Sequence, residues 1–97
     1  MTTETLAALL DQKHGIQTEP ESHCPGRAGL TLPLPHGAAI WISEQPDGDP
    51  GFVAEFHSAA DSDGWGRTIE VEGIESLAVV ADTIAAVARA GSIDCNH

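Results

Sequence analysis

The chain has 97 residues, of which 41% are hydrophobic and 4% aromatic, and its formal net charge at pH 7 is −11. This length and composition predict one globular domain, residues 1–97, with one modest core, because the hydrophobic fraction is too high for a disordered chain. The charge argues against direct binding to nucleic acid or to an anionic membrane, since phosphates would be repelled. It favours a basic protein partner; the alternative is that acidity serves only solubility.

The first ten residues, MTTETLAALL, carry Glu4 and lack the basic segment that opens a signal peptide. No apolar run approaches the roughly 18 residues of a membrane-spanning helix. We therefore expect a cytoplasmic protein. In that reducing compartment Cys24 and Cys95 are expected to be free thiols.

Residues 3–14 are predicted to form a short helix. Thr2 or Thr3 can cap it, the leucines among residues 6–10 follow helical spacing, and Gly15 is a natural end. A short strand at 16–19 is one interpretation of the next segment. The prolines and glycines of residues 20–29 predict an exposed loop.

Four segments then alternate as strands do. Residues 30–34 contain Pro33, which cannot donate to a sheet, so this segment is an edge strand or a strand end. In 37–44 the isoleucines share one face and Trp41 takes the other. In 52–58 and 67–73 the inner face is expected to hold Phe52, Ala54, Phe56, Ile69 and Val71, and the opposite face Val53, Glu55, His57, Thr68, Glu70 and Glu72.

Residues 74–90 show the strongest helical periodicity, with Ser76 or Glu75 at the start and Gly91 just past the end. The hydrophobic stripe of this predicted helix consists of Leu77, Val80, Ala81, Ile84, Val87 and Ala88. Residues 92–97 are expected to be a loose tail. The element order predicts an α+β fold: a three- to four-stranded antiparallel sheet with an N-terminal and a C-terminal helix packed on one face, a two-layer sandwich.

The stretch DSDGWG, residues 61–66, raises the question of a calcium loop. Asp61, Asp63, Gly64 and Glu70 match the third, fifth, sixth and twelfth positions of such a loop. The first position would be Ala59, which has no ligand, and the flanking segments are predicted strands. A turn between strands, which Asp-Gly favours, is the preferred interpretation.

Two further constellations could carry chemistry. His23, Cys24, Cys95 and His97 form a nominal zinc ligand set, but the first pair is adjacent where zinc sites usually space their ligands. Cys24 lies near Arg27, which could activate a thiolate, yet no histidine spacing marks a partner base. The predictions are therefore no enzyme activity, no metal site and no cofactor.

Acidic residues dominate the stretch from 44 to 75, in which Arg67 is the one basic residue. Together with the strand alternation this predicts an exposed acidic sheet face that includes a tryptophan, a residue type often found in binding hot spots. The alternative is that the 20–29 loop covers Trp41 and the acids are merely solvated. The predicted partner-binding residues are Trp41, Glu55, Glu70, Glu72, Asp61, Asp63 and Trp65.

The resulting hypothesis is a non-catalytic acidic protein-binding module. We expect an inhibitor that occupies the basic surface of a nuclease or other nucleic-acid-handling protein, of the immunity, anti-restriction or anti-CRISPR type. This expectation rests on analogy of size and charge. The alternative is a structural or assembly subunit that forms a homodimer, with acidity serving only solubility.

Overall fold

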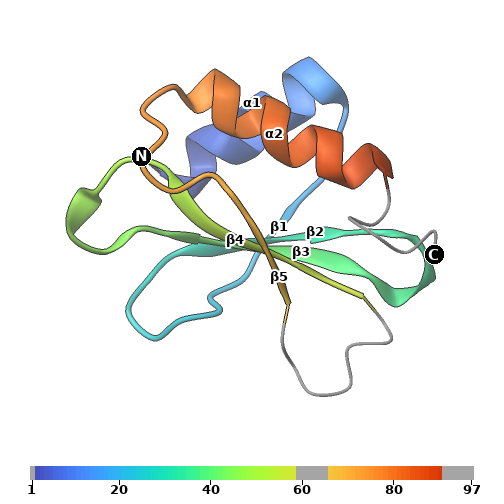
Figure 1. The fold of residues 1–97 in the computed structure, drawn as a ribbon, viewed down its shortest axis with the longest axis horizontal. Coiled ribbons are helices and arrows are strands. Elements are labelled where there is room, and N and C mark those ends of the chain that lie inside the picture. Colours follow the sequence, from blue (N-terminus) through green and yellow to red (C-terminus); the bar gives the residue numbers. More distant parts are fainter. Residues whose placement is uncertain (1, 59–65, 91–97) are drawn as a thin grey trace.

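The computed structural model describes residues 2–58 and 66–90 of the chain. Two α-helices enclose a run of strands and two short 3-10 turns, so the fold is α+β as predicted (Figure 1). In chain order the elements are α1 (Thr3–His14), β1 (Glu19–Pro20), β2 (Gly29–Pro33), η1 (Pro35–Gly37), β3 (Ala39–Glu44), η2 (Pro46–Gly48), β4 (Phe52–His57), β5 (Arg67–Ile69) and α2 (Leu77–Ala90).

The sheet is antiparallel and has five strands in the order β1-β2-β3-β4-β5, so the predicted count of three to four was wrong. The strand left out of that count is β1, which lies at Glu19–Pro20 rather than at the 16–19 considered from the sequence, and which pairs Glu19 with Thr31 and Pro20 with Leu30. Two residues are too few to show an alternating pattern, and Pro20 has no N–H to donate. Because β1 pairs along the edge of β2 that β3 leaves open, β2 is an inner strand of the sheet. Pro33 is the last residue of β2.

Helix α1 begins and ends where the sequence predicts. The Thr2 hydroxyl accepts a hydrogen bond from the Thr5 N–H at 3.3 Å, and the Thr3 N–H donates to Glu44 Oε2 at 2.9 Å. A carboxylate from β3 therefore satisfies one of the donors left open at the helix start. Gly15 ends the helix in the left-handed conformation, with φ 67°, which a glycine adopts without strain.

Helix α2 begins at Leu77 rather than at residue 74. Ser76 caps it, since its hydroxyl accepts a hydrogen bond from the Val79 N–H at 3.3 Å. Ile74, just before the cap, packs against the core without being helical. The predicted stripe is confirmed at Val80, Ala81 and Ile84, each of which is completely buried.

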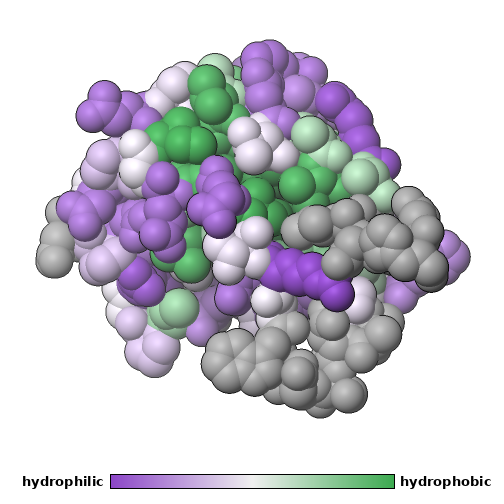
Figure 2. Space-filling view, viewed as in Figure 1, coloured by the Kyte–Doolittle hydropathy of each residue, from purple (hydrophilic) through white to green (hydrophobic). Residues whose placement is uncertain are grey.

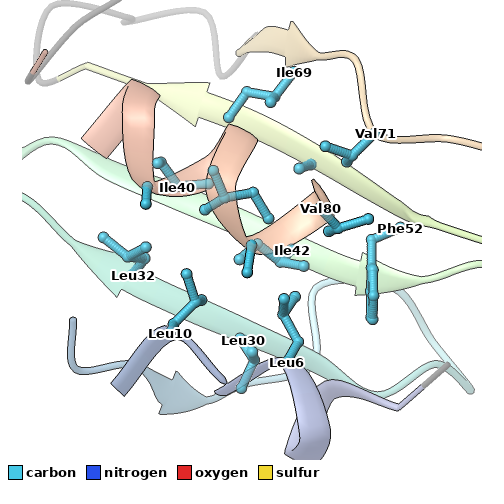
Figure 3. Close-up of a cluster of buried hydrophobic side chains, with 14 of the residues drawn as sticks. Leu6, Leu10, Leu30, Leu32, Ile40, Ile42, Phe52, Ile69, Val71 and Val80 are labelled. Carbon is cyan, nitrogen blue, oxygen red and sulfur yellow. The ribbon is translucent and has the colours of Figure 1, made fainter. Parts of the chain in front are cut away.

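Both helices lie on the same side of the sheet (Figure 1). Figure 3 shows side chains from the helices and from the strands pointing into one common core. Strand alternation explains which sheet residues take part, because every second side chain of β3 and β4 points toward the helices. The buried core is Leu6, Leu10, Leu30, Leu32, Ile40, Ile42, Phe52, Ala54, Phe56, Ile69, Val71, Val80, Ala81, Ile84 and Ala85.

A polar clamp joins the two helices at the C-terminal end of α1. The Arg89 guanidinium, which can only donate, donates to His14 Nδ1 at 2.7 Å. His14 Nε2 therefore carries the ring proton and donates to Asp82 Oδ1 at 2.8 Å. Lys13 also reaches Asp82, at 3.0 Å. The largely buried imidazole is thus satisfied on both nitrogens by α2.

Replacing Ile84 with Ala tests the helix face that the core uses. Ile84 is completely buried, so Ile84→Ala should lower the free energy of unfolding by about 2–5 kcal/mol. The control is Val79→Ala on the same helix, whose parent side chain is 48% exposed and whose loss should cost at most about 0.5 kcal/mol. Urea denaturation measures both, and equal losses would contradict the assigned face.

The clamp also predicts acid sensitivity. Hydrogen bonds from Lys13 and then His14 hold the pKa of the Asp82 carboxyl below its ordinary value. Because the folded pKa is depressed, the ionised carboxylate stabilises the fold above the unfolded pKa of about 3.9, and this contribution is lost as pH falls through the folded value.

Asp82→Asn removes the charge and should therefore lower the melting temperature at pH 7, with a gap to wild type that narrows below about pH 4. Thermal melts by circular dichroism from pH 7 to pH 3 measure this gap. Glu4→Gln, at the other end of α1, removes the same charge outside the clamp. A gap for Asp82→Asn that stays constant down to pH 3 would contradict the assignment.

Candidate protein-binding face

The side of the sheet that faces away from α1 and α2 is called here the outer face. Residues that are paired directly across neighbouring strands share a face of the sheet, and one row of such residues lies on the outer face. The paired positions are Glu19, Thr31, Trp41, Glu55 and Thr68. The prediction that Trp41 and Glu55 share a face agrees with this register, in which they are direct neighbours.

In Figure 2, hydrophobic surface (green) gathers in the half of the view that holds the helices, with hydrophilic residues (purple) around it, and the surface below it that is not grey is mainly hydrophilic. Two large hydrophobic side chains among the described residues stay exposed, Val79 on α2 and Trp41 on the outer face. Trp41 is 40% exposed, which makes it the aromatic centre of a polar surface.

Trp41 is held between two imidazole rings. The His23 ring lies parallel to the indole, at an interplanar angle of 4° and a centroid distance of 4.6 Å. The His57 ring lies on it at 4.0 Å and 28°. We call these three residues the His-Trp-His stack. His23 comes from the β2 side of β3 and His57 from β4 on its other side, so the two rings cover opposite faces of the indole and leave its edge exposed.

His23 is fixed by the neighbouring strand. Its Nε2 lies 3.0 Å from the Leu30 carbonyl, which can only accept, so Nε2 carries the ring proton. The same nitrogen lies 3.1 Å from the Thr31 hydroxyl, and that hydroxyl donates a short hydrogen bond to Glu21. The loop between β1 and β2 therefore places the His23 imidazole against Trp41 and the Glu21 carboxylate next to Thr31.

The His57 ring is held differently, by ring and backbone contacts and by the approach of a carboxylate. Its side chain is 12% exposed, and its Nε2 has no hydrogen-bond partner in the described part of the chain. Glu55 Oε1 lies 3.5 Å from that nitrogen, close enough for an ion pair when the ring is protonated. The backbone of Gly66 lies close to the same ring, since a Cβ atom at this position would approach Nε2 to 2.6 Å.

The remaining predicted face residues fall into two groups. Glu70 and Glu72 are exposed, while Val71 between them is buried in the core. Strand β5 ends at Ile69, before the predicted end at 73, because the Val71 N–H bonds back to the Ile69 carbonyl at 2.9 Å. A single bridge, Gly51 to Glu72, continues the pairing. The other predicted residues, Asp61, Asp63 and Trp65, lie outside the described residues.

Sequence reasoning missed Glu19, Glu21, His23 and Thr31 as members of this face. The 20–29 loop was expected to be exposed, or else to cover Trp41, and the structure combines the two. His23 covers one side of the indole, yet much of Trp41 stays accessible. The strand β1 that sets this loop in place carries no alternation, so no sequence signal would have identified His23.

The other candidate sites gain no support. Across residues 2–58 and 66–90, no group of three His, Cys, Asp or Glu side chains is arranged to hold a metal ion. Cys24 forms no disulfide within that part, and its sulfur lies 3.9 Å from the Ser43 hydroxyl. Cys95 and His97 of the nominal zinc set, and Asp61 to Gly64 of the calcium-loop interpretation, lie outside the described residues.

A cleft of about 470 Å³ lies elsewhere, between α1 and the β1–β2 segment, and does not include the stack. Within the described ranges, no helix has the length and apolar character that a membrane crossing requires. No protein-family model, curated protein or solved structure matches this chain. The candidate site therefore rests on its own geometry.

Gly66→Ala tests whether His57 is wedged between Gly66 and Trp41. The new methyl group would displace the imidazole ring, whose Nε2 has no hydrogen-bond partner among the described residues, so the free energy of unfolding should change by less than about 1 kcal/mol. The fluorescence of Trp41, measured with Trp65 replaced by Phe, should change as its neighbour moves. In a His57→Ala background Gly66→Ala should have no such effect. Identical Trp41 emission with and without Gly66→Ala would contradict the contact.

Proposed function

We propose that the chain is a non-catalytic protein-binding module, a two-layer α+β sandwich that presents its outer face to a basic protein surface. The observation that carries the proposal is the His-Trp-His stack, because it holds a 40% exposed tryptophan rigidly at the centre of a row that has carboxylates on both sides. A preorganised aromatic side chain is the kind of residue that anchors protein interfaces.

The carboxylates around Trp41 favour a basic partner. Glu55 is Trp41's direct neighbour on β4, Glu19 lies two strands away on the other side, and Glu70 and Glu72 extend the acidic surface past β5. With a net charge of −11, the protein attracts basic surfaces over distances limited by salt screening. Arginine fits best, since its guanidinium pairs with carboxylates through two hydrogen bonds.

The occupied ring faces refine this picture. An incoming arginine cannot stack on Trp41 while His23 and His57 lie on it. It can pair with Glu55, whose side chain is 40% exposed, while its aliphatic part packs on the indole edge. The interface therefore needs both the edge of Trp41 and the carboxylate beside it.

A homodimer through the same face is the less favoured alternative. Two copies joined there would bring Glu55 and Glu70 of one copy against the acidic row of the other. Like charges placed opposite each other cost several kcal/mol across an interface. The charge that disfavours a second copy favours a basic protein.

The finer proposal is that this partner handles nucleic acid. A surface that binds phosphates is basic, and an acidic face of a small domain can occupy it in place of the nucleic acid. Inhibitors of the immunity, anti-restriction or anti-CRISPR type act in this general way, and the analogy is one of charge and size. The chain would then act by occlusion, with no chemical step of its own.

Charge reversal on the outer face tests the proposal. Glu55→Lys with Glu70→Lys should abolish capture of the basic partner in an affinity purification from the native cells. The matched control is Glu4→Lys with Asp11→Lys on α1, which changes the net charge equally on the helix side. Trp41→Ala should also weaken binding, by roughly tenfold or more, chiefly through faster dissociation in surface-binding kinetics.

Two further readouts separate the alternatives. The captured protein should lose its own nucleic-acid binding when one equivalent of the wild-type chain is added, and keep it when the Glu55 and Glu70 variant is added. Equal capture by wild type and the outer-face variant would contradict the proposed face. A dimer mass in sedimentation that the same reversal dissolves would support the structural-subunit alternative instead.

A further inference from the structure

The two rings against Trp41 are titratable. Histidine as a residue type changes charge between about pH 5 and 8. A cation within about 6 Å of an indole centroid is attracted by the ring, and the two imidazoles lie at 4.6 and 4.0 Å. The stack can therefore take up protons without coming apart, so that its charge changes while its geometry is kept.

His57 can accept a proton at Nε2. Its Nε2 is buried and has no hydrogen-bond partner in the described part of the chain, and Glu55 Oε1 lies 3.5 Å away. A proton on this nitrogen would turn that contact into an ion pair. Glu55 is also the carboxylate that we propose for the partner's arginine, so protonated His57 and the partner compete for one group.

His23 adds a second proton acceptor on the opposite side of the indole. Its Nε2–H is already committed to the Leu30 carbonyl and the Thr31 hydroxyl, so an added proton goes to Nδ1. The described charged groups that face the two rings are Glu55 from β4 and Glu21 from the β1–β2 loop, the latter through Thr31. Positive charge gained by either ring would thus appear between carboxylates of the proposed binding face.

We propose that the His-Trp-His stack is a proton-operated release switch for the outer face. While the rings are neutral, the carboxylates are available to a basic partner. When the rings take up protons, positive charge appears at the centre of the face, His57 engages Glu55 across the 3.5 Å contact, and the partner is released. This inference rests on the proposed function for its biological meaning, while the proton response belongs to the isolated protein.

The proton response is tested on the full chain carrying Trp65→Phe, which leaves Trp41 as the one tryptophan. Between pH 8 and pH 5, Trp41 fluorescence and the indole N–H chemical shift should follow the same transition as the ring protons of His23 and His57. His57→Phe keeps a stacked ring without a titrating group and should remove its part of the transition. His36→Gln, an exposed histidine in η1, is the matched control and should leave the transition unchanged.

A Trp41 signal that stays flat over this range would overturn the switch. So would a transition that persists unchanged in the double variant His23→Gln, His57→Phe. The chemical shifts are read on the protein with both histidines present, so the test does not depend on the folding of the double variant.

Release is tested with a deca-arginine peptide as the basic probe, by calorimetry at low salt. The chain with Trp65→Phe should bind about tenfold more weakly at pH 5.5 than at pH 7.5, because protonated imidazoles would place positive charge beside the carboxylates that the peptide uses. The double variant should show a smaller loss. Glutamate carboxyls as a class titrate near pH 4, so a loss in this range reports the imidazoles.

The outcomes separate the two proposals. Peptide that binds equally at both pH values while Trp41 titrates would overturn the release switch and leave the binding face standing. Peptide that fails to bind at pH 7.5, or binds equally after Glu55 and Glu70 are reversed, would overturn the proposed function. In that case a titrating Trp41 would still establish the proton response of the stack.

Discussion

The structure depends on the burial of one side of strands β3 and β4. Ile40, Ile42, Phe52 and Phe56 are completely or almost completely buried, and they are the centre on which both helices pack. A slip of one residue in either strand would move the buried side chains of that strand to the opposite face. The hydrophobic cost of such a slip, about 1.5–3 kcal/mol for each large side chain exposed, fixes the register. Everything on the outer face, including the position of Trp41, follows from that register.

Two helices can bury only one side of the sheet, and the other side is left for polar residues. On this outer face the register puts Trp41 next to Glu55, and the loop after β1 adds His23. The indole would be an isolated hydrophobic side chain on an acidic surface without its two imidazoles. With them it is packed on both faces and open at its edge, which combines rigidity with access. Under the proposed function, a partner would meet a surface that needs little ordering on binding.

The sequence predicts the parts of this arrangement that repeat with a period. The alternation of residues 37–44 and 52–58 places Trp41 and Glu55, and the stripe of α2 places Ile84. Prediction from the sequence fails where a single hydrogen bond or a long-range strand pairing determines the structure. The two-residue strand β1 is too short for a pattern, so the position of His23 was not predictable. The end of β5 depends on one backbone bond between Val71 and Ile69, and the start of α2 on the Ser76 cap, which alternation and periodicity do not show.

The central claim is that Trp41 lies on the uncovered side of the sheet between two imidazoles. Nuclear Overhauser effects from the Trp41 ring protons test it most directly in the wild-type protein. The structure predicts strong effects to the ring protons of both His23 and His57, and none to the methyl groups of Val80 and Ile84, which lie in the core. Effects from Trp41 to those helix methyls would contradict the register, and effects to only one imidazole would contradict the stack.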